Sequence, residues 1–204
     1  MKTYIISNFS YEIRIKKDFK TIMRIESMKE MIKNLLKKEL QHKGISEEEF
    51  SKLNKNEMEM LQKKENRYFL KQSERSKIKI VLTGGAFDVL HIGHILTLNE
   101  AKLRGDFLVV AIASDEHIRK KGREPIHAQE YRRIIIESIK SVDIAISGFS
   151  NPQEMIEMVK PNIIVYGYDQ KEFLKPDGIE IVKLEKKYDD SKFKSGKILE
   201  KLGV

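Results

Sequence analysis

Short apolar runs alternate with stretches of helical length over the second part of the chain. The runs are rich in Val and Ile, and they cover residues 78–83, 107–113, 143–147, 162–167 and 179–184. Near-continuous apolar strands separated by helices are typical of a parallel sheet that is covered on both faces. The pattern therefore predicts an α/β fold, a doubly wound five-stranded parallel sheet. Such sheets bind ligands just beyond the carboxyl ends of their strands.

The first part of the chain has helical periodicity instead. Apolar side chains recur there at three- and four-residue spacing, namely Met28, Met31, Ile32, Leu35, Leu36 and Leu40. This spacing predicts a helix over 28–43 with one apolar face, ended by Gly44. Before it, the alternation of Tyr11, Ile13 and Ile15 predicts a strand or a hairpin.

Two further helices are predicted by capping sequences. Ser46 and Asn54 each stand three residues before a glutamate, the spacing of a capping box, which predicts helices over 46–53 and 55–70. The short turn between them gives the connectivity of a helix-turn-helix, and the segment is basic. One interpretation is therefore DNA binding through residues 28–70. The other is a small three-helix unit whose lysines are merely solvated.

Composition narrows the class of protein. The chain has 204 residues, of which 40% are hydrophobic and 34% charged, with a net charge of +8. These values are typical of a globular protein with one domain and an extension, or with two small domains. No run approaches the roughly 18 apolar residues of a membrane helix, and no signal peptide is recognisable, so we expect a cytoplasmic protein without membrane contact. The absence of cysteine excludes disulfides and thiolate nucleophiles.

Charge and turn-forming residues divide the chain near residue 76. Residues 1–76 carry 18 Lys and Arg against 12 Asp and Glu, whereas residues 77–204 carry 21 against 19. All prolines and every glycine except Gly44 lie in the second part. The polar run over 71–77 is typical of a linker. We therefore expect a basic, mainly helical domain over 1–76 and an α/β domain over 77–204.

The sequence GGAFDVLHIGH, residues 84–94, is the most informative loop. Gly84 and Gly85 follow the first strand, where the backbone must approach a ligand closely. His91 and His94 then flank Gly93 at the start of a helix, a position that favours an anion such as phosphate. The alternative is that the two histidines cap the helix or bind a metal ion.

The segment TGGAFDVLHIGH resembles the HxGH signature of the nucleotidyltransferase superfamily, in its small cytidylyltransferase-like branch. The sequences DEHIRKKGREP, EYRRIIIESIKSVD, NIIVYGYDQ and SKFKSGKI follow in the family's order over 77–204. The resemblance implies a Rossmann-like domain in which a phosphate monoester attacks the α-phosphorus of a nucleoside triphosphate and releases pyrophosphate. Class I aminoacyl-tRNA synthetases share the HIGH sequence and a Lys-Ser motif, but this part of the chain is too short for them.

The same resemblance assigns roles to individual residues. It implies that His91 and His94 donate hydrogen bonds to the phosphates of the nucleotide. It also implies that Lys121 binds a phosphate group and that Arg132 binds the β- or γ-phosphate. Other ligand-binding residues implied by the family motifs are Gly84, Gly85, Ala86, Phe87, Asp88, Gly93, Lys120, Arg123, Gly167, Tyr168, Asp169 and Ser195. Ordinary surface charge is the alternative for the lysines and arginines. The family also implies Mg²⁺ bridging phosphate oxygens, for which no protein ligand is assigned because Mg²⁺ keeps much of its water.

The sequence GYDQ, residues 167–170, most resembles that of archaeal FAD synthases, which transfer AMP from ATP to FMN. This resemblance implies ATP and FMN as substrates, and small relatives are commonly homodimers. One alternative is a cytidylyl- or adenylyltransferase that acts on glycerol phosphate, pantetheine phosphate or a sugar phosphate. Another is a regulator that binds DNA through its N-terminal helices and senses a nucleotide.

Overall fold

A computed structural model describes residues 3–148, 151–172, 176–185, 198 and 200–201, with side chains from residue 18 onward. The chain forms two compact units. Unit 1 comprises Met1–Glu39 and Ile45–Lys77, and unit 2 comprises Leu40–Gly44 and Ile78–Val204.

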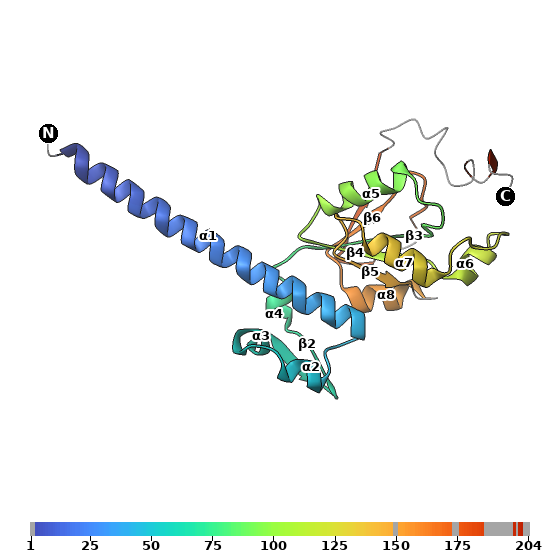
Figure 1. Ribbon diagram of the computed structural model, residues 1–204, viewed down its shortest axis with the longest axis horizontal. Helices are drawn as coiled ribbons and strands as arrows, with labels where there is room; N and C mark the ends of the chain where they lie inside the picture. The colour runs from blue at the N-terminus through green and yellow to red at the C-terminus, as the bar shows by residue number, and fades with distance from the viewer. Residues whose placement is uncertain (1–2, 149–150, 173–175, 186–197, 199, 202–204) are drawn as a thin grey trace. The chain divides into compact units, whose positions relative to one another are not determined.

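Unit 1 begins with one long helix, α1, over Thr3–His42 (Figure 1). The helix predicted over 28–43 is confirmed, but it starts much earlier, and the strand or hairpin predicted near its start is wrong. Tyr11 and Ile15 lie four residues apart, so their spacing also suits a helix. No glycine or proline precedes Gly44 to interrupt it.

The two short helices that follow are α2, Glu47–Ser51, and α3, Lys55–Glu59. Both begin with the predicted capping box. The Ser46 hydroxyl accepts a hydrogen bond from the Glu49 N–H at 3.2 Å, and the Glu49 carboxylate accepts one from the Ser46 N–H at 2.9 Å. Asn54 is bonded to Glu57 in the same two ways.

Beyond Glu59 the prediction of a helix to residue 70 is wrong. Strands β1, Leu61–Lys64, and β2, Arg67–Leu70, form an antiparallel hairpin instead. Its buried positions are Leu61, Tyr68 and Leu70, whereas residues 62–67 are exposed. The chain turns at Glu65, where φ is +52°, a value that no helix residue adopts.

A buried ion pair joins three elements of unit 1. After β2, the helix α4 covers Gln72–Arg75, within the run predicted to be a linker. The guanidinium Nη1 of Arg75 donates to Glu39 Oε1 of α1 at 2.7 Å, and Glu39 Oε2 accepts from the Leu70 N–H at 2.7 Å. Both charged side chains are buried. The carboxylate of Glu39 therefore connects α1 to the end of the hairpin and to α4.

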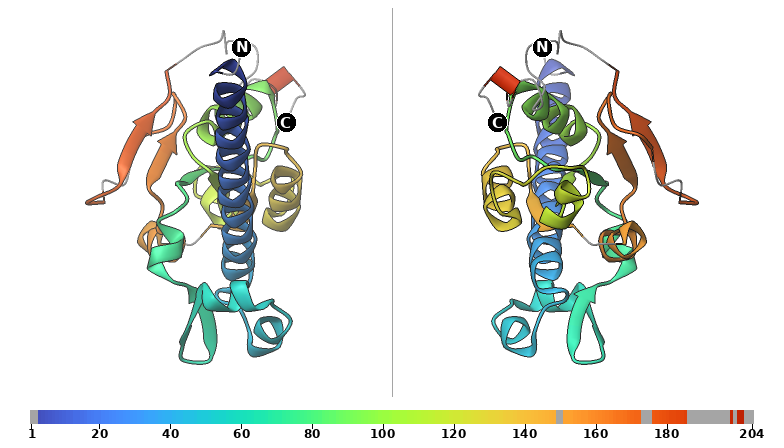
Figure 2. Two further views of the ribbon diagram at one scale, coloured as in Figure 1. Left: turned by 90° about the vertical axis from the view of Figure 1, so that its left-hand side faces the viewer. Right: turned by 90° about the vertical axis from the view of Figure 1, so that its right-hand side faces the viewer.

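Unit 2 contains the predicted five-stranded sheet. Its strands are all parallel, in the order β5-β4-β3-β6-β7, and cover Ile80–Gly85 (β3), Phe107–Ile112 (β4), Ile144–Ser147 (β5), Ile163–Tyr166 (β6) and Glu180–Lys183 (β7). Figure 2 shows β6 and β7 side by side. The strand order reverses between β3 and β6, and such a switch point opens a crevice for ligands at the carboxyl ends.

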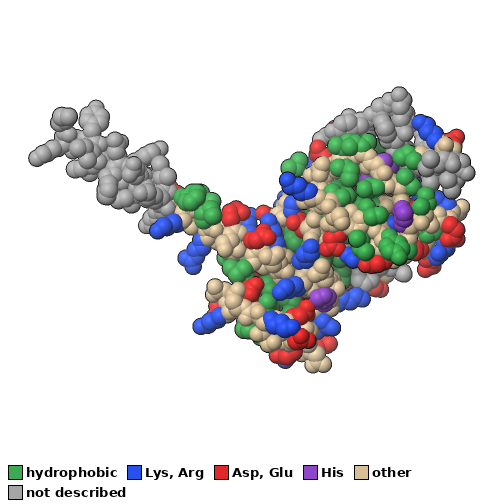
Figure 3. Space-filling model, viewed as in Figure 1, with side chains coloured by type: hydrophobic (Ala, Val, Ile, Leu, Met, Phe, Trp, Pro, Cys, Tyr) green, Lys and Arg blue, Asp and Glu red, His purple; other side chains and the backbone are tan. Residues whose placement is uncertain are grey.

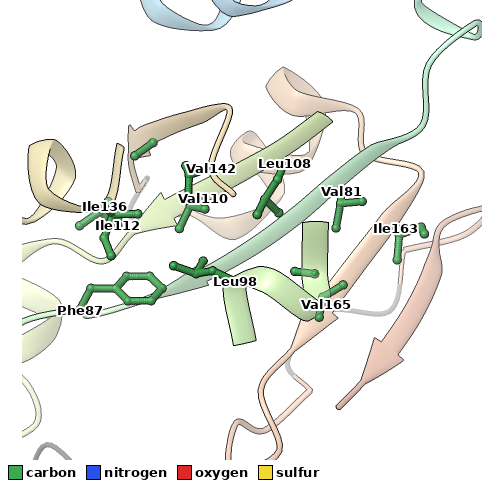
Figure 4. Packing of buried hydrophobic residues seen from close by; sticks show 12 residues of the cluster. Val81, Phe87, Leu98, Leu108, Val110, Ile112, Ile136, Val142, Ile163 and Val165 are labelled. Atoms are coloured by element: carbon green, nitrogen blue, oxygen red, sulfur yellow. The ribbon is translucent and has the colours of Figure 1, made fainter. Parts of the chain in front are cut away.

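In the described ranges, four helices connect these strands, α5 (Ile92–Lys102), α6 (Asp115–Arg119), α7 (Gln129–Glu137) and α8 (Pro152–Val159). One core cluster combines alternate strand residues such as Val81, Leu108 and Val110 with Leu98 of α5 and Ile136 of α7 (Figure 4). Hence α5 and α7 pack on the same face of the sheet. None of the helices in the described ranges combines the length and apolarity needed to cross a membrane.

Candidate functional site

A cavity of about 1770 Å³ opens at the carboxyl ends of β3, β4 and β6 in unit 2. Its walls come from the glycine-rich loop after β3, the start of α5, the loops after β4 and β6, and β7. Pockets for a single drug-sized ligand measure about 300–1,000 Å³. The cavity therefore has room for two substrates side by side.

A pair of histidines stands at the start of α5. His91 is the N-cap of the helix, and its ring stacks on that of His94 with the centroids 3.9 Å apart. Gly93 makes this possible, because a Cβ at its position would lie 3.0 Å from the His91 ring. The sequence HIGH, residues 91–94, places two imidazoles beside the positive end of a helix, where an anion is stabilised.

Both imidazoles are neutral near pH 7. Burial, and to a lesser degree the neighbouring His91, lowers the pKa of His94 to about 4. Burial also lowers the pKa of His91, against the opposing effect of the Asp169 carboxylate. The Nδ1 atoms of both rings are buried and have no hydrogen-bond partner among the residues that the structure describes. Because buried polar groups are nearly always hydrogen-bonded, the pair is suited to a polar ligand.

Phe87 shapes the loop that leads to the histidines. Its φ is +51°, in the left-handed region that a residue with a bulky side chain rarely adopts. The phenyl ring is buried and packs edge-on against His94, with the ring centroids 5.1 Å apart. The strained backbone at Phe87 therefore keeps its phenyl ring in contact with the His94 imidazole.

A buried carboxylate holds the same loop to the segment before α7. Asp88 accepts hydrogen bonds from the Arg123 guanidinium and from the N–H groups of Ile126 at 2.9 Å and His127 at 3.0 Å. Burial raises the pKa of Asp88, but these hydrogen bonds outweigh it and leave the pKa lowered. Asp88 is therefore ionised and shapes the loop, while Arg123 lies partly in the cavity wall.

Basic side chains from α6 and the loop after it line one side of the cavity. Lys120, Lys121 and Arg123 do so, and Lys120 is paired with Glu116 at 2.7 Å. His117 joins them, and its pKa is lowered by burial and by the two lysines. In the sequence, only its place in the run DEHIRKKGR connects His117 with the site. In Figure 3, histidine side chains lie among hydrophobic ones on the visible face of unit 2.

Gln170 connects the two loops at the switch point of the sheet. Its Nε2 donates to the carbonyl oxygen of Gly84 at 2.8 Å, and its Oε1 accepts from the Gly167 N–H at 2.8 Å. In the sequence this glutamine stands out only as the last residue of GYDQ, and its position at the site was not predicted. An amide side chain three residues after the glycine that follows a strand is too weak a signal to identify a site residue.

The cavity brings most of the residues singled out from the sequence together. Those in its lining are Gly84, Gly85, Ala86, Phe87, Asp88, His91, Gly93, His94, Lys120, Lys121, Arg123, Gly167, Tyr168 and Asp169. Ser195 lies outside the described residues. Among the described residues, no group of three or more His, Asp or Glu side chains could hold a metal ion.

Arg132 is placed differently from the expectation that it binds a phosphate. Its side chain is fully buried and is not part of the cavity lining. The guanidinium donates to carbonyl oxygens and to Asp115. The periodicity of the helix indicated neither this burial nor these partners, because they come from loops distant in the sequence.

Comparison with known proteins adds three findings. Residues 82–199 match the model of the cytidylyltransferase-like family. The chain is 37% identical over 145 residues to the FAD synthase of Thermococcus onnurineus, covering 65% of this chain and 96% of that protein, and 42% identical over 121 residues to the FAD synthase of Aciduliprofundum boonei, covering 54% and 80%. A solved structure described as a lipopolysaccharide core biosynthesis protein from Thermoplasma volcanium aligns with a TM-score of 0.50 and 37% identity, covering 55% of this chain and 99% of that one.

Proposed function

The chain belongs to the cytidylyltransferase-like family, and we propose that it is an FAD synthase. It transfers AMP from ATP to FMN and releases pyrophosphate. The observation that carries the proposal is the similarity to archaeal FAD synthases, which spans nearly the whole length of one such protein. The paired histidines at the start of α5 and a cavity with room for two substrates support it.

The reaction needs little covalent help from the protein. A phosphate oxygen of FMN attacks the α-phosphorus of ATP and forms the new P–O bond. The bond between the α-phosphorus and the bridging oxygen breaks, and pyrophosphate leaves with that electron pair. The nucleophile is already an anion, so positioning and charge neutralisation account for the catalysis.

The residues of the cavity are suited to those two tasks. His91 and His94 donate hydrogen bonds to phosphate oxygens at the start of α5, where the helix dipole also favours negative charge. Lys120, Lys121 and Arg123 bind phosphates from the opposite loop. These contacts strengthen as negative charge builds up on the phosphates. They therefore stabilise the transition state more strongly than they stabilise bound ATP.

A divalent cation, Mg²⁺ by default, completes the proposed site. The described residues offer no cluster of three metal-ligating side chains. An ion such as Mg²⁺, which keeps much of its water, would need few protein ligands, and the exposed carboxylate of Asp169 in the cavity wall would be one group that could hold it. Such an ion neutralises phosphate charge when it is bound.

The choice of nucleotide and phosphate acceptor tests whether the protein is an FAD synthase. The purified protein is incubated with Mg²⁺, with either ATP or CTP, and with either FMN or glycerol phosphate, and the products are separated by chromatography. We expect FAD with ATP and little cytidylyl product with CTP. Formation of a product from CTP and glycerol phosphate, with none from ATP and FMN, would instead establish another nucleotidyltransferase.

A further inference from the structure

The guanidinium of Arg132 lies at the junction of three segments around the cavity. Nη1 donates to the carbonyl oxygen of Ala86 at 2.5 Å, and Nη2 donates to that of Ala113 at 2.8 Å and to Asp115 Oδ1 at 2.6 Å. Nε donates to the carbonyl oxygen of His127 at 2.9 Å. The loop after β3, the loop after β4 and the approach to α7 are thus tied to one charged group.

This arrangement leaves the guanidinium no route to a substrate. The Arg132 side chain is 0% exposed, and one carboxylate and three carbonyl oxygens surround it. A planar guanidinium presents its donors in a fixed fork, so it can reach several acceptors at once where an ammonium group cannot. The burial of a charge in this form is costly unless it is satisfied, and here it is satisfied by the loop backbone.

The bond to Ala86 acts on the strained residue that follows. In a planar trans peptide the C=O and the next N–H point in opposite directions. Anchoring the Ala86 carbonyl therefore fixes the orientation of the peptide that leads into Phe87, where φ is +51°. Strained conformations of this kind persist only where their surroundings hold them.

Phe87 in turn contacts His94. Its phenyl ring packs edge-on against the imidazole, and a Cβ at Gly85 would lie 3.0 Å from the same phenyl ring. The ring is therefore confined between the loop backbone and the histidine. Its orientation decides how deeply His94 is buried and where the imidazole points.

We propose that Arg132 is a positioning residue that sets the orientation of His94 through the Ala86–Phe87 turn. It does not bind phosphate itself. The inference rests on the proposed function, in which His94 contacts the phosphates of ATP. A direct phosphate contact by Arg132 and a purely stabilising role are the two competing explanations, and each predicts different measurements.

The test compares Arg132→Lys with Arg133→Gln in the full chain. Arg133 is the adjacent residue on α7 and is paired with Glu130 and Glu137 near the surface, so it is a matched control. The measurements are the ATP dissociation constant, kcat for FAD formation well below the melting temperature, and the His94 pKa from NMR of the imidazole protons. The NMR measurement does not depend on which reaction the protein catalyses.

For Arg132→Lys we expect kcat to fall by about 10- to 100-fold, because small misplacements of reacting groups have effects of this size. ATP affinity should change by less than about threefold. This is well below a tenfold change, which corresponds to about 1.4 kcal/mol of binding free energy. The pKa of His94 should rise toward its usual value as water reaches the ring, while Arg133→Gln leaves all three measurements unchanged. An ATP affinity weakened more than about tenfold with unchanged kcat would overturn the proposal in favour of phosphate contact.

A second variant keeps the inference testable if Arg132→Lys does not fold. Phe87→Leu leaves the guanidinium and its partners intact but removes the ring that faces His94. We expect it to lower kcat and raise the His94 pKa with ATP affinity retained. Unchanged kcat and an unchanged His94 pKa in folded Phe87→Leu would contradict the proposed connection. If wild type forms no FAD but the His94 pKa still rises in Arg132→Lys and Phe87→Leu, the proposed function fails and the positioning role stands.

Discussion

At the scale of single residues, burial controls the chemistry of the histidine pair. His94 lies against Phe87 and His91, and its pKa of about 4 keeps it neutral in the free protein. A neutral imidazole has one donor and one acceptor, so it can hydrogen-bond a phosphate without full ionic attraction to it. We expect bound triphosphate to raise this pKa, because an adjacent negative charge favours the protonated form.

The same burial makes stability depend on pH. The unfolded chain binds a proton at His94 near pH 6.5, whereas the folded chain does so only near pH 4. Between these values the unfolded state binds more protons, so the free energy of unfolding falls as the pH falls. The contribution of this group reaches about 3 kcal/mol at the acid end.

Urea unfolding followed by circular dichroism at pH 7 and pH 5 measures the effect. The variant His94→Gln cannot titrate at this position, so its stability should fall less than that of wild type over the same interval. His91 and His117 titrate in the same direction and remain in both proteins. An identical pH dependence in the two proteins would show that His94 is not buried as described.

At the scale of elements, the sequence predicts the strands of unit 2 better than the structure of unit 1. Each buried strand is a near-continuous apolar run rich in Val and Ile, a pattern that a surface helix does not show. The hairpin over residues 61–70 is less visible in the sequence, because the exposed polar residues 62–67 separate Leu61 from Tyr68 and the turn at Glu65 has no glycine. Arg132 shows the same limit within a correctly predicted helix, since its partners lie in distant loops.

The pair Glu39–Arg75 predicts how unit 1 responds to mutation. Removal of one partner of a buried ion pair leaves the other charge unsatisfied, so Glu39→Ala should lower the free energy of unfolding by about 3–5 kcal/mol. Glu39→Gln keeps an acceptor for the Leu70 N–H and should have a smaller effect.

The matched control is Glu48→Ala. Glu48 pairs with Lys52 on the surface of unit 1, where both side chains are well exposed. Denaturant unfolding of the three variants should leave this control close to wild type. Equal losses for Glu39→Ala and Glu48→Ala would mean that the buried pair does not hold α1, β2 and α4 together.

At the scale of the whole molecule, the cavity belongs to unit 2 alone. Every residue of its lining lies between Leu82 and Glu185. The Thermococcus onnurineus protein is matched over 96% of its length by 65% of this chain, so most of unit 1 has no counterpart there. We therefore expect that deletion of residues 1–70 leaves kcat and the ATP dissociation constant within about threefold of wild type, less than the tenfold that 1.4 kcal/mol represents.

Activity assays of the purified truncated chain, with its circular dichroism spectrum as the control for folding, decide this point. A folded fragment without activity would show that unit 1 contributes to catalysis. A fragment that aggregates would instead indicate that unit 1 covers an apolar surface.

DNA binding through residues 28–70 and a homodimer both stay predictions. The charge of the short helices argues against DNA binding, because residues 46–59, which contain α2 and α3, carry five Glu and two Lys. A helix pair with excess carboxylates is repelled by the phosphate backbone that dominates nonspecific affinity for DNA.

In the proposed function, the histidine pair at the start of α5 serves the transfer of AMP from ATP to FMN. The most direct test measures FAD and pyrophosphate in one reaction, for wild type and His94→Ala, together with the ATP affinity of each. We predict equal amounts of both products from wild type, and a kcat lowered by about 10²- to 10³-fold in the variant with ATP binding largely retained. Equal losses of turnover and ATP affinity, or FAD formation that is unaffected by the substitution, would contradict this role of the histidine pair.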